Sequence, residues 1–174
     1  MNKVNLELKC YCPDFSKVRN VLKQIGAKKE IVKNQKDYFF ELPASKKNSP
    51  RLKLRIEGKD KTLVYYERPD FTKNKGAVAD IKLYDVNDND LFPFLEKVLG
   101  VKAIVEKKRE VWRKENTVFH LDTVKKVGKI FEIELQKKDK INEKDRAIFE
   151  SYKQKLEPFL GKIIKGSNVD LVVK

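Results

Sequence analysis

Ionisable side chains alternate with aliphatic ones in two segments that lie far apart in the chain. In the first segment, Glu7 and Lys9 share one face of a predicted strand whose other face carries leucines. The second segment repeats this pattern with Glu132 and Glu134. A single strand of this kind more often carries a solvent-exposed ion pair. Because the pattern recurs, we interpret the two charged faces as functional.

Two basic pairs have the same strand spacing, with one residue between the two cations. Lys53 and Arg55 form the first pair, and Lys107 and Arg109 form the second. Basic residues can instead protect an edge strand from aggregation, but both pairs share one side with the acidic residues. We therefore favour anion binding, in which arginine offers two parallel donors and lysine a point charge. The single histidine, His120, is interpreted as structural and receives no catalytic role.

Composition limits the class of protein. The 174 residues suit one domain over residues 1–174, and the formal charge of +14 favours an anionic partner, although 26 acidic residues accompany the 40 basic ones. The amino terminus lacks an apolar signal core, and no apolar run approaches the roughly 20 residues of a spanning helix. We expect a cytoplasmic protein with no membrane partner. Cys10 and Cys12 lie on an apolar strand face and are expected to be reduced core thiols.

The elements that must position these residues follow from periodicity and capping signals. Helices are predicted from the cap Asp14 to Gly26, from Asp88 or Asp90 to Gly100, and from the cap Asn142 to Gly161. The predicted strands cover residues 4–12, 35–42, 51–58, 62–68, 79–86, 104–113, 117–124 and 129–137, with a short C-terminal strand near 169–173.

This order indicates an α+β fold in which each half runs strand, helix, strands. Two such halves can close into one antiparallel β-barrel of about eight strands, with helices outside. The aliphatic strand faces then pack under the helices and the charged faces point inward. Each buried ion costs several kcal/mol unless it is paired, hydrated or bound to a charged ligand. The sequence therefore predicts a wet, ligand-binding tunnel.

Short motifs along essentially the whole chain resemble the CYTH family of triphosphate tunnel enzymes, and class IV adenylyl cyclases in particular. The family opens with Glu-x-Glu-x-Lys, and here Asn5 stands in place of the first glutamate, before Glu7 and Lys9. The other similar segments are Lys53–Arg55, Tyr65–Pro69, Lys107–Arg109, His120–Asp122, Phe131–Glu134 and Ser167–Leu171.

The resemblance implies roles for individual residues. A triphosphate needs distributed cations for its oxygens and a hard divalent metal held by carboxylates, for which Mg²⁺ or Mn²⁺ is suited. The implied catalytic residues are Glu7, Lys9, Glu132 and Glu134. The implied triphosphate-binding cations are Lys9, Lys53, Arg55, Arg68, Lys82, Lys107 and Arg109. The implied metal carboxylates are Glu7, Asp122, Glu132 and Glu134, where Asp122 binds metal directly, through water, or orients a neighbour.

The resemblance also implies an adenylate cyclase, in which the ribose 3′-hydroxyl of ATP attacks the α-phosphorus and pyrophosphate leaves. This preference depends on the segment Tyr65–Pro69. The alternative is a triphosphatase acting on tripolyphosphate, thiamine triphosphate or a nucleoside triphosphate, in which water attacks the terminal phosphorus. The same tunnel serves either reaction, because a fold does not fix which phosphorus faces the nucleophile.

Two non-enzymatic functions compete with these. A non-catalytic nucleotide or polyphosphate binder is favoured by Asn5, which removes a negative charge that would hold the metal. A nucleic-acid-binding module is favoured by the net charge, but no recognised motif is present and acidic residues interleave with the cations. We therefore expect a nucleoside triphosphate or inorganic polyphosphate as partner and no nucleic acid. The sequence is also compatible with a homodimer.

Overall fold

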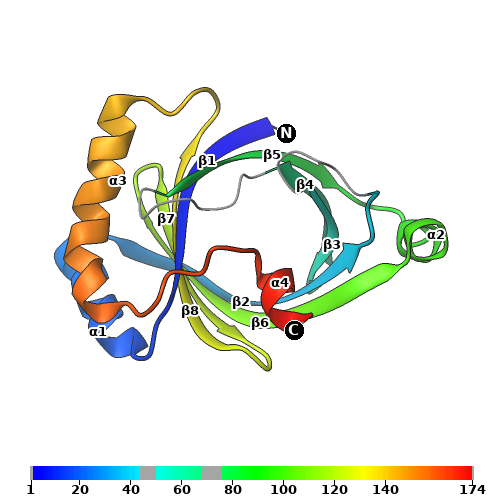
Figure 1. Cartoon of the computed structure of the whole chain (residues 1–174), viewed down its shortest axis with the longest axis horizontal. Helices are drawn as coiled ribbons and strands as arrows, with labels where there is room; N and C mark the ends of the chain where they lie inside the picture. The colour runs from blue at the N-terminus through cyan, green and yellow to red at the C-terminus, as the bar shows by residue number, and fades with distance from the viewer. Residues whose placement is uncertain (1, 44–49, 68–75, 174) are drawn as a thin grey trace.

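The strands of this computed structural model, which describes residues 2–43, 50–67 and 76–173, form a closed antiparallel barrel (Figure 1). Around the barrel the strands follow the order β1-β5-β4-β3-β2-β6-β7-β8. Their bounds are β1 Asn2–Tyr11, β2 Lys28–Phe40, β3 Arg51–Glu57, β4 Asp60–Glu67, β5 Ala77–Asp85, β6 Val101–Lys114, β7 Thr117–Val124 and β8 Gly128–Lys137. The predicted closed barrel with flanking helices is confirmed.

Both faces of the first strand are buried, which explains its alternating sequence. Leu6, Leu8 and Cys10 belong to the apolar core, whereas Glu7 and Lys9 line a cavity. In a closed barrel one face of each strand must point inward, so the charged face of β1 has only the interior to occupy. Burial raises the pKa of the Cys10 thiol to about 11, and the thiol is not in a disulfide, in agreement with a reduced core residue.

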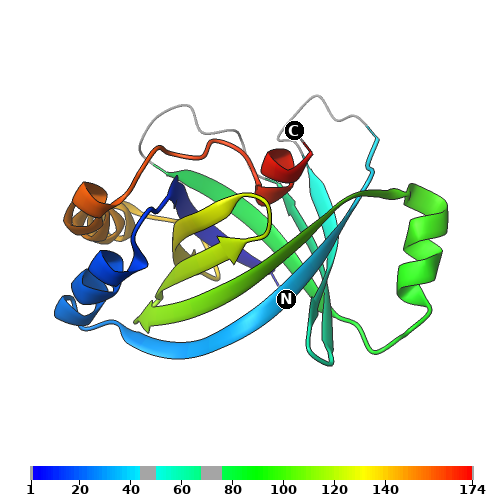
Figure 2. The ribbon, with the colours of Figure 1, turned by 90° about the horizontal axis from the view of Figure 1, so that it is seen from below.

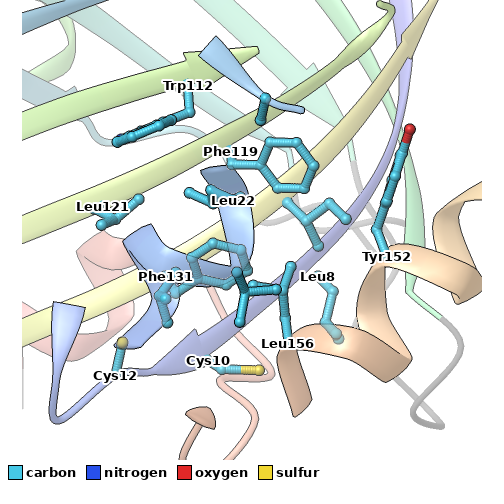
Figure 3. Packing of buried hydrophobic residues seen from close by; sticks show 14 of the residues in the cluster. Leu8, Cys10, Cys12, Leu22, Trp112, Phe119, Leu121, Phe131, Tyr152 and Leu156 are labelled. Carbon is cyan, nitrogen blue, oxygen red and sulfur yellow. The ribbon is translucent and has the colours of Figure 1, made fainter. Parts of the chain in front are cut away.

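Two helices cover the same outer side of the barrel, α1 (Phe15–Gln24) and α3 (Glu143–Leu156) (Figure 1). Asp14 caps α1 by accepting a hydrogen bond from Ser16 N at 2.8 Å, and Asn142 forms the predicted capping box with Asp145. Their apolar faces pack on the outward side chains of β1, β7 and β8 (Figure 3). The core of the protein therefore lies outside the barrel wall, beneath these helices.

A third helix, α2 (Leu91–Leu99), lies at the opposite side of the barrel (Figures 1 and 2). Its Leu95 packs against Phe40 and Leu54 from neighbouring strands. The 3₁₀ turn η1 (Glu157–Phe159) follows α3 directly. Within the described ranges, none of the helices has the length and apolar character needed to cross a membrane.

Two sequence predictions about elements are wrong. β2 begins at Lys28 rather than at residue 35, because the largely exposed stretch before Gln35 pairs with β6 even though it carries no hydrophobic alternation. The predicted C-terminal strand is instead the helix α4 (Asn168–Val172). A capping box between Ser167 and Asp170 starts this helix, with Asp170 Oδ2 accepting from Ser167 N at 2.7 Å.

Candidate functional site

The barrel encloses a polar cavity of about 310 Å³, which falls in the range of small-molecule sites. Its wall consists of the inward side chains of the strands, as the alternation predicted. At one end the helix α4 lies across the barrel (Figures 1 and 2) and its Val169 packs with Phe39, Val105 and Ile130. Asn168 and Ser167 contribute to the cavity wall from this end.

The acidic part of the wall comes from β1 and β8. Glu7 and Glu134 lie directly opposite each other across this strand pair. Asn5 Nδ2 is 3.4 Å from Glu7 Oε1 and 3.3 Å from Glu134 Oε2, so one amide donates to both carboxylates. The Oδ1 atom of Asn5 is buried and accepts no hydrogen bond from the part of the chain that the structure describes. The two carboxylates thus share one amide donor, and it is the nitrogen of the Asn5 amide that is directed at them.

Glu132 has different partners from Glu134. It forms an ion pair with Lys9 at 3.2 Å, the residue opposite it on β1, and accepts a hydrogen bond from Arg109 Nη2 at 2.9 Å. Burial alone would raise the pKa of Glu132, but Lys9 and Arg109 lower it below its usual range. Glu132 therefore stays charged and links the acidic wall to the basic one.

The basic part of the wall begins with Asp37 on β2. Lys53 Nζ donates to Asp37 Oδ2 at 2.7 Å, and Arg55 donates through Nε to Oδ1 at 2.8 Å and through Nη2 to Oδ2 at 2.9 Å. Arg55 lies directly opposite Asp37 in the strand pairing. Although burial opposes ionisation of Asp37, Arg55 and Lys53 hold its pKa well below its usual range.

The same arrangement occurs a second time on β6 and β7. Lys107 Nζ donates to Asp122 Oδ2 at 2.9 Å, and Arg109 donates to Oδ1 through Nε at 2.7 Å and to Oδ2 through Nη2 at 2.6 Å. Arg109 again lies directly opposite the aspartate. We call each set of one aspartate, one lysine and one arginine a clamp: the Asp37 clamp and the Asp122 clamp.

The two clamps are neighbours because β2 pairs with β6, and Gln35 lies opposite Lys107. Four cations are therefore concentrated on one side of the cavity. Burial, together with the charge of Arg55, lowers the pKa of Lys53 to about 7, and burial with the charge of Arg109 lowers that of Lys107 to about 8. Neighbouring positive charges disfavour each other's ionisation, so this wall gains from an anionic ligand.

His120 on β7 reaches the acidic wall, as its shared parity with Asp122 allowed. Its Nε2 is 3.4 Å from Glu134 Oε2, and its Nδ1 is buried with no hydrogen bond from or to the described residues. Burial and Arg109 lower the pKa of His120, whereas Glu134 opposes this shift. A neutral imidazole suits a residue that orients Glu134 by donating to it.

The structure brings most of the predicted site residues together. All of the following predicted residues line the cavity: Glu7, Lys9, Lys53, Arg55, Lys107, Arg109, Glu132 and Glu134. The prediction for Lys82 is wrong. Lys82 is exposed on the outer face of β5, because Ile81 and Leu83 are the residues of that strand that point inward. Arg68 lies outside the described residues. Asp37 and Gln35 line the cavity and were not predicted as site residues.

Asp122 was one of the expected metal carboxylates. Both of its oxygens accept hydrogen bonds from Lys107 and Arg109, and its side chain is fully buried behind them. Of the three roles open to it, orienting its neighbours is the one that its contacts favour. The signal for Asp37 was available in the sequence only as a polar residue directly before Tyr38 and Phe39, and aromatic residues in a strand are typical of a core.

The oxygen donors fit a hard divalent cation, although no group of three or more acidic, histidine or cysteine side chains is gathered among the described residues. Glu7 and Glu134 offer carboxylates side by side, and Asn5 Oδ1 is an unsatisfied oxygen next to them. Mg²⁺ is commonly bound by one or two carboxylates together with substrate phosphates and water. Of the four predicted metal carboxylates, Glu132 and Asp122 contact cations among the described residues, whereas Glu134 contacts Asn5 and His120.

The C-terminal motif fixes α4 over one end of the cavity. Arg51 Nη2 contacts Asp170 Oδ1 at 3.1 Å, and the hydroxyl groups of Tyr66 and Ser167 are 2.6 Å apart. Just before this helix, Ile164 N donates to Lys9 O at 2.9 Å. Residues from both ends of the sequence therefore meet at the same end of the barrel.

Comparison with known proteins agrees with this fold and site. The CYTH domain model matches residues 3–162, and the chain belongs to the CYTH family. A protein of Methanocaldococcus jannaschii named "Putative adenylate cyclase" is 29% identical over 150 residues, which cover 84% of this chain and 85% of that protein.

Solved structures share the fold over nearly their whole length. A protein of Pyrococcus horikoshii has a TM-score of 0.76 at 22% identity, with 97% of this chain and 99% of that chain covered. A "putative adenylyl cyclase" from Hippeastrum, described as having a dominant triphosphatase activity, has a TM-score of 0.61 at 13% identity, covering 95% of this chain and 91% of that one. At these identities the likeness establishes the fold alone.

Proposed function

We propose that this protein is a divalent-metal-dependent enzyme that converts ATP to cyclic AMP and pyrophosphate inside the barrel. The observation that carries the proposal is the presence, in one cavity, of an acidic wall with paired oxygen donors facing a basic wall with two clamps. A triphosphate coordinated to a metal needs both kinds of surface at once.

The residues of the basic wall would bind the phosphates. Lys53, Arg55, Lys107 and Arg109 offer donors that the two aspartates pre-orient, so little side-chain entropy is lost on binding. Lys9 lines the cavity from β1, and its ion pair with Glu132 holds its ammonium group in place. These cations would neutralise the charge that accumulates on pyrophosphate as it leaves.

The acidic wall would hold Mg²⁺ or Mn²⁺, and Glu7 and Glu134 are the proposed ligands. Such a metal withdraws charge from phosphate oxygens and makes the phosphorus a better electrophile. Asn5 and His120 donate to these carboxylates and would keep their oxygens directed into the cavity. The missing first glutamate of the family motif leaves the site with a lower negative charge, which predicts weaker metal binding.

A triphosphatase is the second candidate, and one observation favours it. Apart from His120, the aromatic side chains among the described lining residues are Phe39 and Tyr66, and both pack in the core beneath α4. Lys53 Nζ also lies 5.2 Å from the centre of the Phe39 ring and 5.9 Å from that of Tyr66. Phe39 is buried and Tyr66 is partly buried, so the described wall offers little aromatic surface for stacking on a nucleobase, which an inorganic triphosphate would not require.

Product analysis tests the proposal. Purified protein is incubated with ATP or with tripolyphosphate, in the presence of Mg²⁺, Mn²⁺ or a chelator, and products are separated by anion-exchange chromatography. The proposal predicts cyclic AMP and pyrophosphate from ATP in equal amounts, only with metal. Orthophosphate from tripolyphosphate would establish the triphosphatase instead. Glu134→Gln provides the matched control and should remove whichever activity is found.

A further inference from the structure

The two clamps have the same contacts but different surroundings. The side chains of Lys53 and Arg55 are 11% and 20% exposed, whereas those of Lys107 and Arg109 are 2% and 6% exposed. Asp37 itself lines the cavity, and among the described residues Asp122 is not part of the cavity wall. The Asp37 side chain is only 2% exposed, but it borders the cavity beside its more exposed cations, whereas Asp122 lies behind Lys107 and Arg109.

The Asp122 clamp is also fixed by a further carboxylate. Arg109 Nη2 donates to Glu132 at 2.9 Å in addition to Asp122, and Glu132 is itself paired with Lys9. Moving Arg109 would therefore disturb two ion pairs in a fully buried region, which is costly. For Arg55 the nearest second carboxylate is that of Glu57, whose Oε1 is 3.9 Å from Arg55 Nε and which Lys33 and Gln35 already engage.

Lys53 has an alternative contact close to its present position. Its Nζ lies near the faces of the Phe39 and Tyr66 rings, at 5.2 and 5.9 Å from their centres. An ammonium group within about 6 Å of a ring centre is attracted to the ring face. Lys53 can therefore move away from Asp37 toward a ligand while keeping a favourable contact, and its four-carbon stem allows this motion.

We propose that Asp37 is a resident counter-ion which a bound polyphosphate displaces from Lys53, whereas Asp122 keeps Lys107 and Arg109 in place throughout. This inference depends on the proposed function, which supplies the polyphosphate ligand. In the empty protein, Asp37 balances one of two adjacent buried cations. When an anionic product such as pyrophosphate remains, the same carboxylate competes with it for Lys53. Asp37 thus limits affinity and favours product release.

Calorimetry of tripolyphosphate binding in chelator tests this inference. Asp37→Asn keeps an oxygen that can accept from Arg55 Nε but removes the charge, so its affinity should increase by about tenfold or more. Asp122→Asn is the matched control from the equivalent clamp: it removes the same charge, but Asp122 is not displaced, so its gain in affinity should be at least about threefold smaller. Unchanged or weaker binding by Asp37→Asn, or equal tightening by both variants, would overturn the inference.

A measurement on the wild-type protein avoids dependence on the folding of a variant. The ¹³C resonance of each aspartate carboxyl carbon reports its hydrogen-bond partners during a tripolyphosphate titration. We expect the Asp37 carboxyl signal to shift on saturation and the Asp122 signal to stay in place. A stationary Asp37 signal, or equal shifts of both, would contradict displacement. If the wild-type protein binds no tripolyphosphate in either experiment, the proposed function itself fails, which is distinct from binding without displacement.

Discussion

Glu7 and Glu134 face each other across the β1–β8 strand pair, and Asn5 Nδ2 donates to both carboxylates. Like charges directly opposite in a sheet destabilise it, and the amide reduces this repulsion in the empty protein. The third carboxylate that the family motif would place at this position is absent. The proposed metal site therefore has one negative charge fewer than the family motif would supply.

Replacing Asn5 tests the consequence of that difference. Asn5→Glu removes the bridging donor and adds a third negative charge, so the metal-free protein should melt at a lower temperature. Its melting temperature should increase more on addition of Mn²⁺ than that of the wild type, and metal-dependent turnover should rise. Asn5→Gln, which keeps the amide, serves as control. An unchanged response to metal together with unchanged turnover would contradict the assigned role of this position.

Acidic and basic residues should differ in which step they affect. Glu134→Ala should abolish metal-dependent turnover while leaving tripolyphosphate affinity in chelator close to that of the wild type, because it removes a proposed metal ligand. Arg55→Ala should chiefly weaken affinity, by about tenfold or more, because a bidentate cation is lost. Measuring turnover and affinity separately distinguishes the two effects. Normal turnover by both variants would refute the assignment of the cavity as the site.

The position of Lys82 provides a control for the cations of the cavity. Lys53→Ala should reduce tripolyphosphate affinity by about tenfold or more, since its ammonium group faces the cavity. Lys82→Ala should leave affinity unchanged, because Lys82 is exposed on the outer face of β5. The two variants remove the same formal charge, so equal losses would show that net charge rather than the cavity governs binding.

The affinity for tripolyphosphate should depend on pH through Lys53. Burial and the charges of Arg55 and Lys107 lower the pKa of Lys53, and Asp37 raises it, with a result of about 7. A phosphate favours the protonated form, so above pH 7 binding must be accompanied by proton uptake, and affinity should fall as pH increases from 7 to 9. Lys53→Arg, whose guanidinium does not titrate in this range, should show a shallower decrease. Equal slopes for the two proteins would exclude Lys53 as the titrating group.

The apolar layer outside the barrel should control stability and leave the cavity intact. Phe119 is fully buried, with its ring 6.4 Å from that of Phe131 and 5.5 Å from that of Tyr152 (Figure 3). Phe119→Ala should lower the free energy of unfolding by about 3–5 kcal/mol. Tripolyphosphate affinity below the melting transition should remain near the wild-type value. Denaturant unfolding and calorimetry measure the two quantities independently.

The sequence predicted the barrel because strand alternation fixes which side chains face inward. The inward placement of Glu7, Lys53 and Arg109 followed directly from that alternation. Lys82 was misplaced because we expected the polar face of each strand to point inward, whereas in β5 the apolar face with Ile81 and Leu83 lines the cavity. Asp37 was missed as a site residue because its partners on β3 lie 16 and 18 positions away in the sequence, and spacing along one strand carries no information about cross-strand ion pairs.

The acidic residues of β8 show the same limit of prediction from sequence spacing. Sequence spacing grouped Glu132 with Glu134, since both lie on the inward face of β8. Only the strand pairing reveals that Glu132 meets Lys9 and Arg109, whereas Glu134 meets Asn5 and His120. Residues that share a face thus have different electrostatic partners, which spacing along one strand does not reveal.

A crystal structure with Mn²⁺ and a non-hydrolysable ATP analogue tests the central claim most directly. The account predicts an anomalous manganese peak between Glu7 and Glu134, with phosphate oxygens contacting Lys53, Arg55, Lys107 and Arg109 inside the barrel. Phosphates bound on the outer surface, or manganese held away from both glutamates, would contradict the claim that this cavity is where the triphosphate is processed.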